Sequence, residues 1–164
     1  MFGGSTSSRL FREVREKRGL AYAVGSYTQQ YVDSGMIGLY VGTREDNVDE
    51  ACGIIGRELA SVHAEGITDD ELARAKEHVK GRMVLSSEST AARMARISKA
   101  VLFDTPLLTL DELLARIDAV TGDDVAELAR ELYDPGSLSA AAIAPSEDRF
   151  RTALAPVSET LAAA

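Results

Sequence analysis

The sequence lacks several residue types on which common functions depend. It has no tryptophan, one cysteine and two histidines among 164 residues, and aromatic residues make up 5%. One cysteine, Cys52, excludes an internal disulfide and suits a reducing compartment, so we expect a cytoplasmic protein. So few aromatic side chains offer no platform for base stacking, and the net charge of -8 argues against nucleic-acid binding.

Long apolar runs and the usual catalytic motifs are also missing. No run approaches the ~20 apolar residues of a membrane-spanning helix, so we expect no membrane partner. His63 and His78 have no cysteine or histidine at ligand spacing. The sequence RAKEH at residues 74–78 differs by one residue from the inverted zinc motif H-x-x-E-H. Because Arg74 has no lone pair for a metal, we interpret this segment as a solvated helix face and expect no metal site.

Hydrophobic periodicity predicts an α+β fold, with an antiparallel or mixed sheet and several helices packed on one face. In chain order the sequence predicts a helix at residues 8–18, two strands joined by a turn at residues 32–35, a helix at residues 48–66, helices opened by Thr68, Thr109 and Thr121, a helix through residues 94–101, and a third strand at residues 137–145. We expect one domain at residues 1–150 and an alanine-rich tail at residues 151–164 that frays or belongs to an extra segment.

Positive charge gathers on the first predicted helix, and one arginine there has no obvious partner. The residues three and four positions from Arg15 are arginines, Phe11 and Gly19, so no carboxylate of this helix reaches it. Arg15 is therefore either simply solvated or available to an anion or carbonyl group. Tyr22 follows on the predicted strand, on the face of Leu20 and Val24. It is either a core tyrosine or a phenol in a cleft beside Arg15.

These residues occur within a longer stretch that resembles a known family. The glycine pair at residues 3–4, the sequence SRLF at residues 8–11, then Arg15 and GLAY at residues 19–22 occur in an order that resembles the C-terminal domain of pitrilysin/insulinase-type zinc metallopeptidases, or inverted zincins. The turn at residues 33–35 and the helical segment at residues 65–90 are similar as well. Bacterial members of this family resemble the processing peptidases of mitochondria.

The resemblance implies a non-catalytic half of a zinc-dependent endopeptidase whose opening strand and helix are absent here. In the family, zinc is bound by an H-x-x-E-H motif in a preceding homologous domain, and this chain has no such motif. The chain alone should therefore hold no cofactor and be inactive, while the complete peptidase holds Zn²⁺ and is completed by an H-x-x-E-H domain or subunit. Arg15 and Tyr22 would hold the peptide substrate and the oxyanion. The further substrate-binding residues implied are Gly3, Gly4, Ser8 and Arg9.

Two other expectations accompany this interpretation. The same family includes core proteins of a respiratory complex, so the alternative function is a catalytically inert structural or assembly subunit. A domain without its opening strand would also expose an unpaired sheet edge, and we therefore expect self-association or strand exchange.

Overall fold

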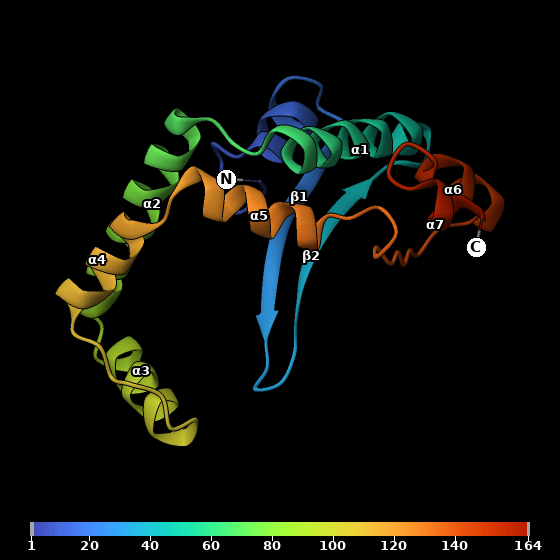
Figure 1. Ribbon diagram of the computed structural model, residues 1–164. Coiled ribbons are helices and arrows are strands. Elements are labelled where there is room, and N and C mark those ends of the chain that lie inside the picture. Colours follow the sequence, from blue (N-terminus) through green and yellow to red (C-terminus); the bar gives the residue numbers. More distant parts are fainter. Residues whose placement is uncertain (1, 164) are drawn as a thin grey trace. The chain divides into compact units, whose positions relative to one another are not determined.

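The computed structural model describes residues 2–163 and confirms the α+β class. The described residues divide into two compact units, one of residues 2–66 with 125–163 and the other of residues 67–124 (Figure 1). The expected domain of residues 1–150 therefore contains the whole of the second unit and most of the first. No helix among the described residues is long and apolar enough to cross a membrane.

The first unit is built around a long antiparallel hairpin of β1 (Ala21–Gln30) and β2 (Gly35–Thr43), drawn in blue and teal in Figure 1. The strands run in register from their ends at Gln30 and Gly35 back to a single irregularity near the start of β1. The predicted turn at residues 32–35 is confirmed, and the backbone N–H of Tyr31 donates to the carbonyl of Ser34 across it at 2.9 Å.

The core of this unit lies where the base of the hairpin meets two helices. The π-helix η1 (Phe11–Glu16) contacts β1, and the long helix α1 (Val48–Glu65) contacts both β2 and η1. The short helix η2 (Glu45–Asn47) leads from β2 into α1. The buried cluster at this junction consists of Val14, Leu20, Ala21 and Ile54, with Val24 and Val41 packed against it.

The segment at residues 137–145 is not a strand, and that prediction is wrong. Its alternating small and apolar residues resemble a strand pattern, but a strand also needs a neighbour that supplies ladder hydrogen bonds. Among the described residues none pairs with it, and Ile143 is fully exposed.

Residues 151–163, where the sequence predicted fraying, are helical for most of their length. They include the end of α6 (Glu147–Leu154) and all of α7 (Glu159–Ala163). Helix α6 packs against α1, and the side chains of Ala153 and Leu154 are buried. The alanines expected to make the tail loose are small enough to pack closely against a neighbouring helix.

The second unit consists of helices. It contains α2 (Asp69–Ser87), α3 (Thr90–Leu102) and α4 (Leu110–Ala119), and α2 contacts both of the others. Helix α5 (Gly122–Leu132) starts in this unit and continues into the first. The capping boxes at Thr68 and Thr109 are confirmed, and Thr121 exchanges the same pair of hydrogen bonds with Asp124.

Candidate functional site

The helix that carries Arg15 ends in an unusual conformation. Its last turns form a π-helix, in which the backbone N–H of Lys17 donates to the carbonyl of Arg12, five residues back, at 2.9 Å. The helix stops at Gly19, as predicted, and this glycine has a φ of 62°, which residues with a Cβ rarely adopt. Short π-helical segments occur frequently at functional sites. Here the wider turn carries Arg15 and leads directly into β1.

Glu13 is the acceptor for the neighbouring positive charges. Lys17 Nζ lies 2.5 Å and an Arg18 guanidinium nitrogen 2.8 Å from its carboxylate oxygens, and Arg12 approaches to 3.9 Å. The hydrogen bonds from Lys17 and then Arg18 lower the pKa of Glu13. Arg18 is therefore paired although it lies five positions from Glu13, a spacing at which a regular α-helix does not bring side chains together. The π-helical turn brings it within reach of Glu13.

Arg15 has a different environment. No ion pair involving it occurs among the residues that the structure describes. Its guanidinium carbon instead lies 4.4 Å from the ring centroid of Tyr22 and 4.7 Å from that of Phe11. Stacking on two aromatic rings holds the guanidinium in place without neutralising its charge. The structure thus brings together Arg15 and Tyr22, the two residues that the sequence singled out.

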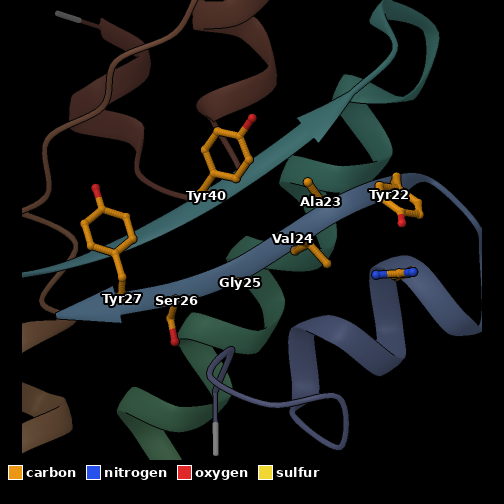
Figure 2. Close-up of a pocket in the computed structure, with 8 residues that line it drawn as sticks. Tyr22, Ala23, Val24, Gly25, Ser26, Tyr27 and Tyr40 are labelled. Atoms are coloured by element: carbon orange, nitrogen blue, oxygen red, sulfur yellow. The ribbon is translucent and has the colours of Figure 1, made fainter. Parts of the chain in front are cut away.

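Tyr22 is the extra residue of a β-bulge. Residues 21 and 23 of β1 pair with the consecutive residues 43 and 42 of β2, so Tyr22 has no partner of its own in the ladder. A bulge of this kind bends the strand and redirects the side chain of the inserted residue. The Tyr22 side chain is 83% exposed and lies at the start of β1 (Figure 2).

The bulge corrects the predicted alternation of faces. Leu20 and Ala21, which are adjacent in sequence, are both buried in the core, and Val24 packs against the same cluster. Tyr22 does not share this face, so the prediction that placed it with Leu20 and Val24 is wrong. Strict alternation would have put the phenol in the core, and the inserted residue releases it to the surface beside Arg15.

Arg15 and Tyr22 form one end of an open hollow on the hairpin. The residues that line it are Arg15, Tyr22, Ala23, Val24, Gly25, Ser26, Tyr27 and Tyr40. Figure 2 shows the rings of Tyr27 and Tyr40 rising from the same face of the hairpin as Ala23, whereas Val24 points to the opposite face. The sequence analysis did not single out Tyr27 and Tyr40. The feature that distinguishes them is that each ring is paired with a glycine on the opposite strand. That pairing can be recognised only once the register of the hairpin is known.

The predicted glycine pair lies at the edge of this strand. The carbonyl of Gly3 accepts a hydrogen bond of 3.0 Å from the backbone N–H of Ser26. A Cβ at Gly3 would lie 2.5 Å from that nitrogen, so the close approach requires a glycine. Gly4 is exposed, and a Cβ there would meet no atom within 4 Å. Among the described residues, neither lines the hollow.

Ser8 and Arg9 face other parts of the unit. Ser8 is buried, and its hydroxyl has no hydrogen-bond partner among the described residues. Arg9 lies against α1, where a guanidinium nitrogen is 3.2 Å from Ser61 Oγ and 3.6 Å from a carboxylate oxygen of Glu58. The structure does not bring these two residues to the hollow, and their substrate-binding role stays a prediction.

The side chains that might have held a metal are dispersed. No group of three or more metal-ligating residues occurs within residues 2–163. His78 is exposed on α2, and His63 lies on α1 in the other unit. Cys52 is buried, as its place on an apolar helix stripe predicts, and burial raises the pKa of its thiol, which disfavours the reactive thiolate.

Comparison with known proteins gives a consistent result. The family described as "Peptidase M16 inactive domain" matches residues 1–79. A relative named as an uncharacterized zinc protease, from Streptomyces coelicolor, is 48% identical over 130 residues, which are 79% of this chain and 28% of that protein. Residues 1–79 therefore belong to the inactive domain of the M16 peptidases. The M16 peptidases are the pitrilysin/insulinase-type enzymes that the sequence resembles.

Comparison with solved structures supports the same assignment. The M16 inactive domain from Pseudomonas fluorescens superposes with a TM-score of 0.68 and 26% identity over 79% of this chain and 31% of that chain. A chain of complex III from Candida albicans superposes with a TM-score of 0.67 and 26% identity, over 77% of this chain and 30% of that one. The chain spans about a third of the length of the curated relatives that it matches.

Proposed function

We propose that this M16 chain is the non-catalytic half of a zinc-dependent metalloendopeptidase. It binds and orients a peptide substrate, and it supplies Arg15 and Tyr22 to an active site completed by an H-x-x-E-H domain or subunit. The described residues contain no donor set for zinc, so the ligands would come entirely from that other part. Relatives named zinc proteases support a zinc enzyme as the complete protein.

The observation that carries the proposal is the pairing of Arg15 with Tyr22. A guanidinium with no ion pair among the described residues stacks at 4.4 Å on an exposed tyrosine, at one end of an open hollow. A purely structural arginine is normally paired with a carboxylate when one is near, and Glu13 is two residues away but is occupied by Lys17 and Arg18. Tyr22 is also the most exposed of the five tyrosines, at 83%.

This arrangement suits the stabilisation of negative charge. The guanidinium offers several N–H donors and the phenol offers one O–H donor, and both are held by the π-helix and the bulge before any substrate arrives. Donors that are positioned in advance act most strongly on charge that develops during a reaction. The backbone carbonyl of a peptide, and the oxyanion formed from it, have the chemistry that such a pair recognises.

The test is peptide hydrolysis by this chain combined with the polypeptide that carries the H-x-x-E-H motif. We expect Tyr22→Phe and Arg15→Ala each to lower kcat by about 10²–10³-fold. The matched controls, Tyr31→Phe at the hairpin tip and Arg12→Ala on the same helix, should leave kcat within about twofold. Peptide turnover by this chain alone, unchanged by Tyr22→Phe and Arg15→Ala, would contradict the proposal.

A second function is favoured by the likeness to a chain of complex III. In this alternative the chain is a catalytically inert structural or assembly subunit. The two functions make opposite predictions for the same pair of residues. If Tyr22→Phe and Arg15→Ala leave all peptide turnover unchanged but a stable complex with other subunits is purified, the structural function is supported instead.

A further inference from the structure

Part of the hollow beside Arg15 is lined by strand positions that have no side chain. On the exposed face of the hairpin, three successive cross-strand pairs are Ala23 with Gly42, Gly25 with Tyr40, and Tyr27 with Gly38. Each tyrosine on this face is therefore opposed by a glycine. At Gly25 no side chain covers the strand, although a Cβ there would lie 3.1 Å from the backbone carbonyl oxygen of Gly3. The ring of Tyr40 comes from the residue opposite Gly25, and the ring of Tyr27 from the next residue on the same face of β1 (Figure 2).

The two rings are held away from Gly25 by contacts with the other glycines. A Cβ at Gly38 would lie 2.6 Å from Tyr27 Oη and 2.7 Å from its Cε1, so this ring lies across Gly38. A Cβ at Gly42 would lie 3.0 Å from Tyr40 Oη, so this ring leans along its own strand toward Gly42. Aromatic rings that cover cross-strand glycines are a known way of stabilising a strand pair. Here they also leave a notch over Gly25, which we call the Gly25 notch.

The chemistry of the Gly25 notch limits what can occupy it. Its walls are aromatic rings, and its floor is glycine backbone and the Ala23 methyl group. Arg15 lines the same hollow and has no carboxylate partner among the described residues, so a lysine or arginine side chain would be repelled. An aromatic or large aliphatic side chain gains both ring contacts and apolar burial without that penalty.

We infer that the Gly25 notch is a specificity subsite for an aromatic or large aliphatic side chain of the peptide held by Arg15 and Tyr22. This inference rests on the proposed function. Arg15 and Tyr22 act on the peptide backbone, which every substrate has, whereas Tyr27 and Tyr40 select among side chains. Successive side chains of an extended peptide alternate in direction, so one position in the peptide would supply the group that enters the notch.

The experiment measures selectivity instead of overall rate. Peptides that differ at a single position, as Phe, Leu, Ala, Lys or Asp, are scanned with this chain combined with its H-x-x-E-H partner. At the position that enters the notch, we expect kcat/KM to favour Phe over Ala by about tenfold and to be lowest for Lys. Tyr40→Thr and Tyr27→Thr, which keep a strand-favouring residue, should reduce the Phe-to-Ala ratio to below about threefold. Tyr31→Thr is the control and should preserve it.

The outcomes separate this inference from the proposed function. If Tyr22→Phe lowers kcat for all peptides but no variant of Tyr27 or Tyr40 alters the Phe-to-Ala ratio, the peptidase function stands and the subsite is refuted. A second measurement needs no variant and no catalysis. In amide NMR spectra of this chain, a Phe-containing peptide at millimolar concentration should shift the signals of Ala23, Gly25 and Gly42 more than its Ala counterpart. Equal shifts for both peptides would overturn the inference.

Discussion

The contact between α1 and the C-terminal segment predicts opposite effects on stability when two nearby glycines of α1, Gly53 and Gly56, are replaced by alanine. A Cβ at Gly56 would lie 2.5 Å from the carbonyl carbon of Pro156 and 3.0 Å from the nitrogen of Val157, against 3.4–4 Å for ordinary contact. Both atoms belong to the backbone, so relief requires the segment between α6 and α7 to move by about 1 Å. At Gly53, one turn earlier on α1, a Cβ would meet only the side chain of Arg57, at 3.6 Å.

The magnitudes follow from helix propensity and overpacking. Replacing glycine by alanine within a helix contributes about 0.5–1 kcal/mol of stability where space is free. We therefore expect Gly53→Ala to stabilise the protein by about that amount. Gly56→Ala gains the same stabilisation, but the forced backbone shift costs roughly 2–3 kcal/mol. The free energy of unfolding should therefore fall by about 2 kcal/mol. For a chain of this length, such a loss lowers Tm by about 4–8 °C.

Thermal unfolding followed by circular dichroism measures whether each variant is more or less stable than the wild type, and amide hydrogen exchange shows which residues are affected. In Gly56→Ala, exchange should rise in residues 147–163, because α6 loses its packing against α1 and α7 packs against α6. In Gly53→Ala, exchange there should remain as in the wild type. Two variants with equal Tm values, or a Gly56→Ala variant more stable than the wild type, would refute the packing of this segment against α1.

Two further predictions concern stability. Glu13→Gln should destabilise the protein by less than about 1 kcal/mol at pH 7, since its cationic partners are largely exposed. Because the pKa of Glu13 is lowered in the folded state, its contribution is complete above the ordinary pKa of glutamate, about 4.3, and fades as pH falls through the folded value. Urea titrations should therefore show a smaller deficit at pH 3 than at pH 7. Glu16→Gln, at a neighbouring position of the same helix, is the control at pH 7. Thr68→Ala removes a capping box and should lower stability by about 1 kcal/mol. The loss should be visible as faster amide exchange in the first turns of α2. The control Thr105→Ala, outside the helices, should not change that exchange.

Local signals in the sequence were sufficient for much of the fold. The caps at Thr68 and Thr109 and the helix stop at Gly19 depend on a few adjacent residues, and each is confirmed. The segment at residues 137–145 was misjudged because strand formation depends on a partner that may come from anywhere in a chain. Local pattern cannot distinguish a strand from an extended segment without that partner.

The sequence analysis singled out Arg15 and Tyr22, which the structure brings together, but it did not predict their geometry. The lack of a carboxylate at helical spacing from Arg15 correctly indicated a cation without an ion pair, and the short turn after Gly19 placed Tyr22 within reach. The π-helix and the β-bulge were not visible, since each adds one residue to a regular repeat and leaves no mark on composition. The sequence periodicity alone therefore placed Tyr22 on the wrong face of β1.

The bulge makes the exposure of Tyr22 a matter of chain length as well as of residue type. In a strand that alternated regularly back from Val24, with no bulge, residue 22 would fall on the core side, and Arg15 would lose one of its two rings. Residue types around Tyr22 can change while the number of residues is kept. Removing Ala23, or adding one residue between Tyr22 and Val24, would change the count by one. Regular alternation from Val24 would then keep the ring on the outer face without a bulge, so the bulge and the residue count at this position compensate for each other.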